Sequence, residues 1–235
     1  MCYSNSSTSS NVELGKTYQK KIDLLPPNNP IYCANGFTFP EWPIITVDDN
    51  IQIMKWGLIP HWFRSENTHE IANKTLNARI ESLAEKASFK SLTQGKRCII
   101  PSTGFFEYQH QGKARNPFFI FPKDDSVFSM AGLYDEWLNP ISGLPTLSFT
   151  IITTTANSLM EEIHNSKKRM PLILSPNQIE AYLQAEKPIE KYDMIHENKM
   201  DAHRIDKKII QSNNYNIPEV QQCYVDNIGQ QISLF

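Results

Sequence analysis

The chain has 235 residues with a formal net charge of −2 at pH 7, and 40% of them are hydrophobic. This length suits one domain with a sizeable core, and the charge excludes binding to polyanions through overall basicity. With no basic and apolar leader and no apolar run near ~18 residues, neither a signal peptide nor a membrane span is expected. The four cysteines lack metal-site spacing, which predicts free thiols in a reducing cytoplasm and no bound metal.

In chain order, the predicted elements begin with a flexible polar arm at residues 4–11 and a turn-rich connection at 25–30. Runs rich in Ile, Phe, Tyr and Thr predict strands at residues 44–47, 51–56, 97–100, 104–108, 117–121, 127–134 and 147–154. Helices are predicted at residues 81–92, 157–164, 176–184 and 186–197.

Strands and helices do not alternate regularly along the chain, which argues against a doubly wound parallel sheet. The pattern predicts an α+β fold, a compact β-rich domain with a bent, mostly antiparallel or mixed sheet flanked by short helices. The sheet is expected to be barrel-like. Residues 1–235 are predicted to form this single domain, with 209–235 as a loosely packed tail.

Cys2 is the residue with the most distinctive chemistry. Processing generally removes Met1 before so small a side chain, and Cys2 would then carry a free α-amine beside its thiol. The amine has a pKa near ~8 and the thiol a pKa near ~8.5, so both are usable nucleophiles. An amine condenses with an aldehyde to an imine, and the thiol can add to the imine carbon to close a five-membered ring. An arbitrary small residue after the start is the simpler interpretation of Cys2 alone.

Polar or aromatic residues interrupt the strand-like runs at several further places. Trp56 suits either core packing or stacking against a planar base. Asn77 and Arg79 share one face of an extended segment, where Asn77 holds a backbone group or an amine and Arg79 a phosphate, or where both simply face solvent. Glu107 ends an apolar run, where burial would raise its pKa and suit proton transfer; strand alternation could instead turn it to solvent.

A histidine and a basic group follow the threonine-rich strand at 147–154. His164 is expected at the end of a helix, either as a C-terminal cap or as an acid–base group. Lys167, Lys168 and Arg169 form the densest basic group in the chain, which suits contact with a phosphate backbone.

These residues lie within a series of long motifs in a fixed order. The motifs are Met1-Cys2, WGLIP at 56–60, NARIE at 77–81, RCIIPSTGFFEY at 97–108, AGLYDEW at 131–137, TIITTTAN at 150–157, and His164 followed by RMP at 169–171. In these motifs the chain resembles the SRAP family (SOS response-associated peptidase), the abasic-site processing proteins. The resemblance runs from Cys2 to about Leu174 and is much more specific than a single short pattern.

The resemblance implies a monomer without cofactor or metal that binds abasic sites in single-stranded DNA, cytoplasmic and associated with the nucleoid when bound. It implies that Cys2 forms a thiazolidine crosslink to the abasic site and so protects the lesion in the DNA damage response. DNA lyase and autoproteolytic peptidase activities are implied as further activities. Asn77 would orient the Cys2 terminus, Glu107 would move protons, and His164 would act as acid or base.

The resemblance also implies the contacts with DNA. Arg79 would hold a phosphate, and Trp56 or a neighbouring apolar side chain would stack against a base beside the lesion. Many family members carry Arg at the fourth position, where this chain has Ser4. A phosphate contact at this position is absent or supplied by Lys167 or Lys168. In addition, residues 166–168 alter the spacing between His164 and the Arg-Met-Pro motif.

Two alternative functions stay open. In an N-terminal-cysteine hydrolase or peptidase, the Cys2 thiol attacks an amide and its own amine is the base. Such an enzyme needs an oxyanion hole, and no motif in the sequence indicates one. In a non-covalent single-strand-binding module, Asn77, Glu107 and His164 would be ordinary surface residues.

Overall fold

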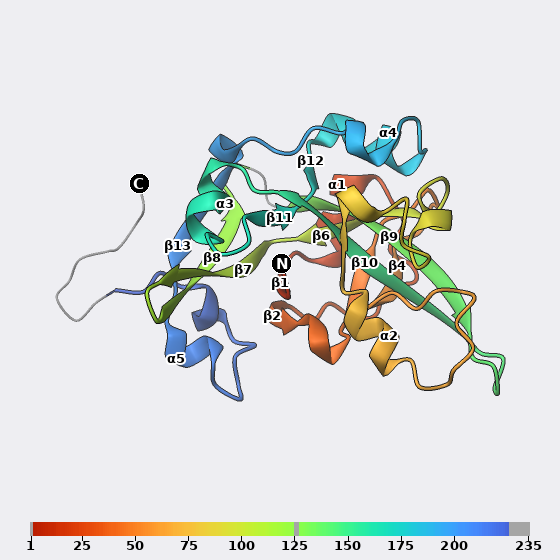
Figure 1. Ribbon diagram of the computed structural model, residues 1–235, viewed down its shortest axis with the longest axis horizontal. Helices are drawn as coiled ribbons and strands as arrows, with labels where there is room; N and C mark the ends of the chain where they lie inside the picture. The colour runs from red at the N-terminus through yellow and green to blue at the C-terminus, as the bar shows by residue number, and fades with distance from the viewer. Residues whose placement is uncertain (1, 125–126, 226–235) are drawn as a thin grey trace.

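Two β-sheets form the centre of the molecule, whose computed structural model describes residues 2–124 and 127–225. The first sheet has five strands in the order β13-β8-β7-β1-β2, and each neighbouring pair is antiparallel (Figure 1). β1 therefore has a hydrogen-bonded neighbour on each side. The strands are β1 (Ser4–Ser7), β2 (Ile31–Asn35), β7 (Gly104–Gln111), β8 (Ala114–Pro122) and β13 (Met200–Arg204).

The second sheet runs β12-β9-β10-β4-β3, with β5 and β11 paired to β10 and β6 paired to β9. β10 is parallel to β4 and β5, while the other pairs of this sheet are antiparallel. Its strands are β3 (Glu41–Ile44), β4 (Gln52–Trp56), β5 (Asn77–Arg79), β6 (Arg97–Ser102), β9 (Phe128–Leu138), β10 (Pro145–Thr155), β11 (Arg169–Pro171) and β12 (Ile173–Leu174). The predicted α+β class with mixed sheets is confirmed, but the sheets stay open and do not close into a barrel.

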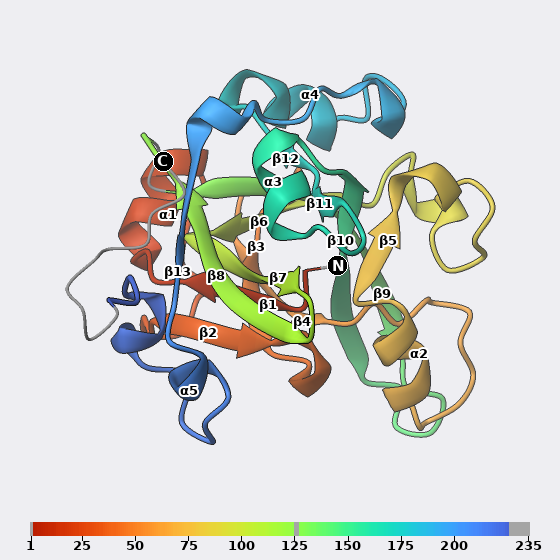
Figure 2. The same ribbon diagram turned by 60° about the vertical axis from the view of Figure 1, so that its left-hand side comes forward.

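Short helices surround the two sheets (Figures 1 and 2). The α-helices are α1 (Asn11–Tyr18), α2 (His69–Lys74), α3 (Ser158–Ile163), α4 (Ile179–Leu183) and α5 (Lys207–Ile210). The 3₁₀ turns are η1 (Gly36–Thr38), η2 (Ile80–Ser82), η3 (Lys90–Leu92), η4 (Pro176–Gln178), η5 (Ile189–Lys191), η6 (Glu197–Lys199) and η7 (Pro218–Gln221). Among the described residues, no helix has the length and apolar content that crossing a bilayer requires.

Several local predictions were wrong. Residues 4–11 are not a flexible arm, because β1 occupies the first half and α1 begins at Asn11. Ser10 caps that helix through a capping box with Glu13, which satisfies backbone N–H groups at the helix start. The predicted helices at 81–92 and 186–197 contain only 3₁₀ turns in place of α-helix.

Burial also revises the expected loose tail. Val220 is fully buried and Ile210 nearly so, and both pack in one cluster with Cys33 and Phe106. Ile210 and Val220 therefore attach this segment to the core, whereas Val225 is exposed and residues 226–235 lie outside the described residues.

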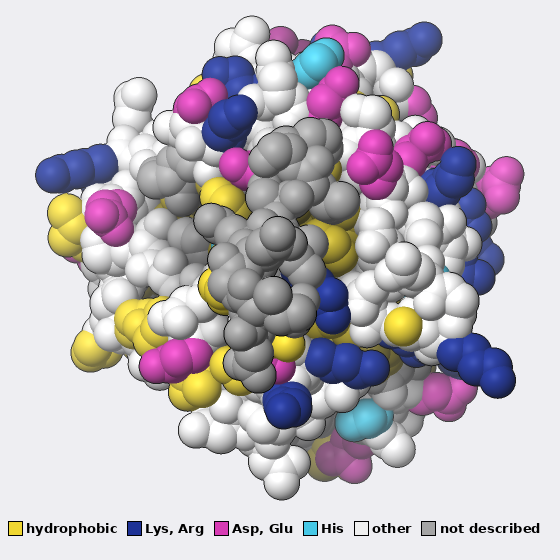
Figure 3. Space-filling view, turned by 90° about the vertical axis from the view of Figure 1, so that its left-hand side faces the viewer, with side chains coloured by type: hydrophobic (Ala, Val, Ile, Leu, Met, Phe, Trp, Pro, Cys, Tyr) yellow, Lys and Arg dark blue, Asp and Glu magenta, His cyan; other side chains and the backbone are white. Residues whose placement is uncertain are grey.

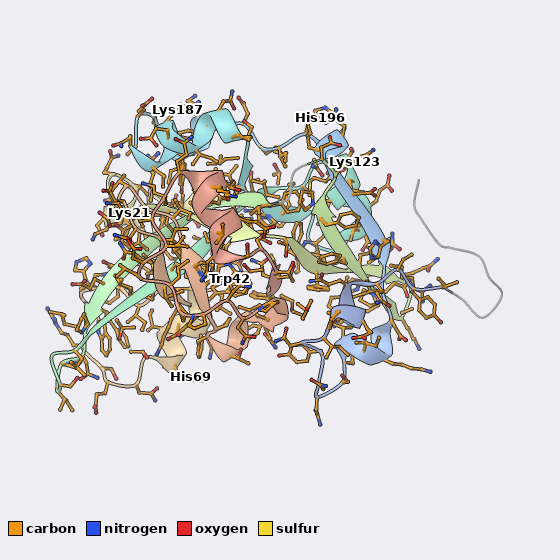
Figure 4. All side chains as sticks on the ribbon, turned by 180° about the vertical axis from the view of Figure 1, so that it is seen from behind. Lys21, Trp42, His69, Lys123, Lys187 and His196 are labelled. Carbon is orange, nitrogen blue, oxygen red and sulfur yellow. The ribbon has the colours of Figure 1, made fainter. Side chains whose placement is uncertain are left out.

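The largest cluster of buried side chains draws on both sheets and includes Cys2, Trp42 and Phe105. Trp42 lies in the interior in Figure 4, whereas Lys21 and Lys187 lie at the periphery. On the face shown in Figure 3, basic and acidic side chains are interspersed, as the near-neutral total charge leads one to expect. Cys2 therefore belongs to the core and is not the start of a loose arm.

Candidate functional site

The position of Cys2 follows from the pairing of β1. Ser4 lies opposite Phe106 of β7 and opposite Asn35 of β2, so the residues before Ser4 run alongside Glu107. A buried polar network holds this register: the Asn5 amide oxygen accepts hydrogen bonds from Ser102 Oγ and from the Ser6 backbone N–H. Because a slip by one residue would turn Asn5 to the opposite face, the network favours a single register.

Cys2 is fully buried, and its carbonyl oxygen is held by a side chain from the second sheet. Asn77 Nδ2, at the start of β5, donates to that oxygen at 2.9 Å. The Cys2 thiol donates to the Ser4 carbonyl oxygen at 3.6 Å. Burial, together with the nearby Glu107 carboxylate, raises the pKa of the Cys2 thiol well above its usual range, so it is a protonated thiol at neutral pH.

Glu107 is 6% exposed, on the strand that flanks β1. Strand alternation therefore turns Glu107 inward, as the proton-transfer hypothesis required. Burial raises the pKa of its carboxyl group to about 7, because a charged carboxylate is poorly solvated there. At neutral pH the group is present in comparable amounts as acid and as base, which suits proton transfer in both directions.

His164 lies directly after α3, which Asn157 caps at its other end. His164 Nδ1 is 2.8 Å from the Arg169 carbonyl oxygen and 3.7 Å from Glu107 Oε1. Since a carbonyl oxygen can only accept, Nδ1 carries the hydrogen and the neutral ring has its lone pair on Nε2. Burial lowers the pKa of His164, which favours this neutral form.

The structure thus brings together the four predicted catalytic residues from distant parts of the chain. Asn77 donates to the Cys2 carbonyl oxygen, the Glu107 carboxylate lies 3.7 Å from the His164 ring, and strand pairing carries the residues before Ser4 alongside Glu107. Figure 2 shows the start of β1 close to β10 and β11, and strand pairing places it beside the middle of β7. The arrangement offers a thiol, an orienting amide, a carboxyl group with a pKa near neutrality and a neutral imidazole.

Trp56 does not have the exposed position that stacking against a base would require. It is fully buried, its indole N–H donates to the Leu76 carbonyl oxygen at 2.8 Å, and its ring stacks on Phe149. A side chain covered on all sides presents no face to a base, so the predicted stacking role is corrected to one in core packing.

Arg169 is likewise buried and is already bound within the protein. Its guanidinium donates to Glu81 Oε1 at 2.5 Å and to the Thr153 carbonyl oxygen at 2.6 Å. Burial opposes ionisation of Glu81, but the hydrogen bond from Arg169 lowers the pKa of that carboxyl group below its ordinary value. Arg169 therefore joins η2 to the end of β10, and its predicted role in binding phosphate is corrected to this structural one.

The other predicted DNA-binding cations are exposed. The Arg79 side chain is 62% exposed, with its Nε 3.8 Å from Glu81. Lys167 is exposed, and Lys168 pairs with Glu161 at 3.8 Å. These three side chains are accessible to a phosphate backbone. Within the described part of the chain, no three His, Cys, Asp or Glu side chains come together in a way that could hold a metal ion.

Sequence reasoning missed one aromatic side chain of the site. Tyr3 is partly buried next to Cys2, and burial raises the pKa of its phenol, with smaller effects from the charges of Glu107 and Cys2. Its place directly after Cys2 was a usable signal, but an aromatic residue in a strand-like segment usually indicates core packing.

Comparison with known proteins places the chain in a family. The family model described as SOS response associated peptidase (SRAP) matches residues 1–212. The chain belongs to the SRAP family. A SRAP relative from Bacillus subtilis (strain 168), named abasic site processing protein YoqW, is 36% identical over 220 residues, covering 88% of this chain and 93% of that protein. Abasic site processing protein HMCES of Gallus gallus is 36% identical over 150 residues, covering 55% of this chain and 44% of its own.

Solved structures agree with the SRAP assignment. A crystal structure of a protein from Bacteroides thetaiotaomicron superposes with a TM-score of 0.88 at 38% identity, covering 95% of this chain and 100% of that one. A protein from Bordetella bronchiseptica shares the fold alone, with a TM-score of 0.73 at 20% identity. The SRAP fold is therefore shared well beyond the range of clear sequence similarity.

Proposed function

We propose that this SRAP protein processes abasic sites in single-stranded DNA by forming a covalent thiazolidine through the α-amine and thiol of Cys2. The observation that carries the proposal is the burial of Cys2 with its carbonyl oxygen held by the Asn77 amide, on the segment that runs alongside Glu107. The names of YoqW and HMCES, both abasic site processing proteins, support the substrate class. Removal of Met1 is the step that frees the amine.

Asn77 can accept a hydrogen bond from that amine. Its Nδ2 already holds the Cys2 carbonyl oxygen, while its buried Oδ1 has no hydrogen-bond partner among the described residues. A buried acceptor without a donor costs free energy, and a free amino group on the same residue would supply one. The amide would then fix the amine on one side and the carbonyl on the other.

The reaction begins with the aldehyde form of the baseless sugar. The sugar ring opens when a base removes the C1′ hydroxyl proton and an acid protonates the ring oxygen, and Glu107 can serve in both roles near neutral pH. The α-amine attacks C1′, and the resulting carbinolamine loses its hydroxyl group as water to give an imine. The thiol then adds, a C–S bond forms, and the thiol proton ends on the nitrogen. One water leaves in total, and no oxidant or reductant is needed.

DNA strand cleavage competes with ring closure in this scheme. An imine acidifies the hydrogen on C2′, and a base such as His164 Nε2 could remove it and expel the 3′ phosphate. Addition of the Cys2 thiol removes the imine and with it this elimination path. A DNA lyase activity is therefore a side reaction, and fast ring closure protects the strand. An autoproteolytic removal of Met1 would use the same thiol.

Intact-mass spectrometry tests the proposal directly. We expect a 1:1 adduct whose mass is the sum of the protein from Cys2 and an abasic single-stranded oligonucleotide, less one water. An oligonucleotide whose abasic sugar has been reduced to the alcohol lacks the aldehyde and should give no adduct. Equal adduct with the reduced oligonucleotide would contradict the proposal, and turnover of an amide without DNA would favour the hydrolase alternative.

Asn77→Ala should slow adduct formation about 5- to 150-fold, because it leaves the buried Cys2 carbonyl unpaired and the amine unoriented, a loss of about 1–3 kcal/mol. The rate is measured with excess oligonucleotide on denaturing gels. Asn73→Ala, in α2, is the matched control because its side chain contacts only the exposed His69 ring among the described residues. A rate unchanged in Asn77→Ala would show that the amide does not orient the terminus.

Arg79→Ala and Lys167→Ala should weaken binding to single-stranded DNA of any sequence. Each should reduce the slope of log affinity against log salt by about 0.7, the value for one phosphate contact on a single strand. Affinity is measured by fluorescence anisotropy at several salt concentrations. Lys187→Ala is the control, because Lys187 lies over the Tyr192 ring in the connection after α4. If the slope in Arg79→Ala and Lys167→Ala is the same as in the control and the original protein, these side chains do not contact the DNA.

A further inference from the structure

Two aromatic side chains stand together beside the reactive cysteine. Tyr3 directly follows Cys2, and Phe37 belongs to η1, directly after β2. Their ring centroids are 4.9 Å apart at an interplanar angle of 37°. Phe37 is 47% exposed, which is unusual for so large an apolar ring, while Tyr3 is partly buried beneath it. The pair therefore presents an apolar surface to solvent at the edge of the site.

The register of β1 places this pair next to the chemistry. Because Ser4 lies opposite Phe106, Tyr3 runs alongside Glu107. The effect of the Glu107 and Cys2 charges on the pKa of the Tyr3 phenol agrees with that position. A group bound covalently to Cys2 would be attached to the residue directly before Tyr3.

The backbone holds the pair in place before any ligand binds. The Gly36 N–H donates to the Tyr3 carbonyl oxygen at 2.7 Å, and the Asn35 side chain accepts from the Phe37 N–H at 3.0 Å. Gly36 also lies directly on the Trp56 ring, where an added Cβ would meet ring atoms at 3.2 Å. The buried Trp56 thus supports η1 from below, and little backbone entropy of η1 remains to be lost on binding.

We propose that Tyr3 and Phe37 form a stacking platform for the base that neighbours the abasic sugar. The inference deepens the proposed function and rests on it. An abasic site has no base of its own, so recognition must use the sugar, the backbone and the adjacent bases. Stacking on an aromatic ring is tolerant of sequence because every base has a π-face. A purine, with the larger face, should bind better than a pyrimidine.

The experiment uses oligonucleotides with a tetrahydrofuran abasic analogue, which cannot react with Cys2. One oligonucleotide carries 2-aminopurine beside the analogue, and a second replaces the neighbouring nucleotides with further tetrahydrofurans. Phe37→Ala should raise the Kd for the first about 5- to 150-fold and reduce the quenching of 2-aminopurine. Tyr3→Leu, which keeps apolar volume, should act in the same direction. Neither variant should change the Kd for the oligonucleotide without neighbouring bases.

Two controls keep the result interpretable. Leu138→Ala removes an exposed apolar side chain at the far end of β9 and should leave both Kd values unchanged. Phe37→Trp enlarges the platform, so it should bind the base-containing oligonucleotide at least as tightly as the original protein. Thermal melting verifies that each variant folds.

Equal losses on both oligonucleotides would overturn the platform, as would unchanged quenching in Phe37→Ala. Such a result would indicate that the exposed Phe37 ring binds a partner other than a DNA base, such as a protein. Because the analogue is unreactive, the binding measurement does not depend on the crosslink. A protein that shows the platform effect but gives no adduct with a true abasic site would contradict the proposed function alone.

Discussion

Cys2→Ser should lower the yield of DNA adduct that survives denaturation by about 100-fold or more, because a hydroxyl group is a far weaker nucleophile than a thiol. The variant keeps its α-amine, so it should still form the imine. Borohydride, which reduces an imine to a stable amine, should therefore restore a covalent product for Cys2→Ser. The two measurements on one denaturing gel separate the role of the thiol from that of the amine.

The matched control is Cys223→Ser, since Cys223 is partly exposed and lies outside the site. It should crosslink at the original rate and yield. A stable adduct formed by Cys2→Ser at the original yield, without borohydride, would contradict the thiazolidine. Strand cleavage by Cys2→Ser should increase relative to adduct, because the imine persists and remains open to elimination.

Glu107→Gln should reduce the rate of adduct formation about 10²- to 10⁴-fold at pH 7, the usual contribution of a positioned acid–base group. In the original protein the rate should fall as pH rises through about 7, because the protonated carboxyl group that donates a proton to the sugar ring oxygen is lost. Gln cannot exchange a proton, so this part of the pH profile should disappear in the variant. The measurement is a series of single-turnover rates between pH 5 and 9.

The same carboxyl group should affect stability with a defined sign. Its pKa rises from 4.5 to about 7 on folding, so the folded protein binds more protons than the unfolded chain between those values. The free energy of unfolding therefore falls as pH rises through this range, by on the order of 3 kcal/mol. Glu107→Gln lacks this penalty and should be less sensitive to pH, as measured by urea unfolding at pH 5 and pH 8. A variant that loses stability equally at both values would indicate a packing role for Glu107.

The sequence predicted which residues come together at the candidate site better than it predicted their surroundings. Asn77, Glu107 and His164 were recognisable because polar groups interrupt apolar runs there, and burying such groups is costly without a role. Their mutual distances depend on strand pairing across long stretches of chain, which local patterns do not contain. The resemblance to a family supplied that link.

Exposure was the property that sequence patterns predicted least well. Trp56 and Arg169 both belong to residue types that bind nucleic acid, yet tertiary packing places one in the core and the other against Glu81. The Ser-rich segment at 4–11 has low strand propensity and forms β1 because two neighbouring strands pair with it. The capping box of Ser10 and Glu13 was a readable signal for the helix that follows.

The place of β1 between β7 and β2 has a mechanical consequence for a protein joined to DNA at Cys2. A motor that moves along the DNA would pull on the N-terminal end of β1 along the axis of that β-strand. In that geometry the hydrogen bonds to both neighbours resist together instead of opening one at a time from an edge. A protein anchored in this way should resist extraction by force, and its removal from DNA should depend on its rate of global unfolding.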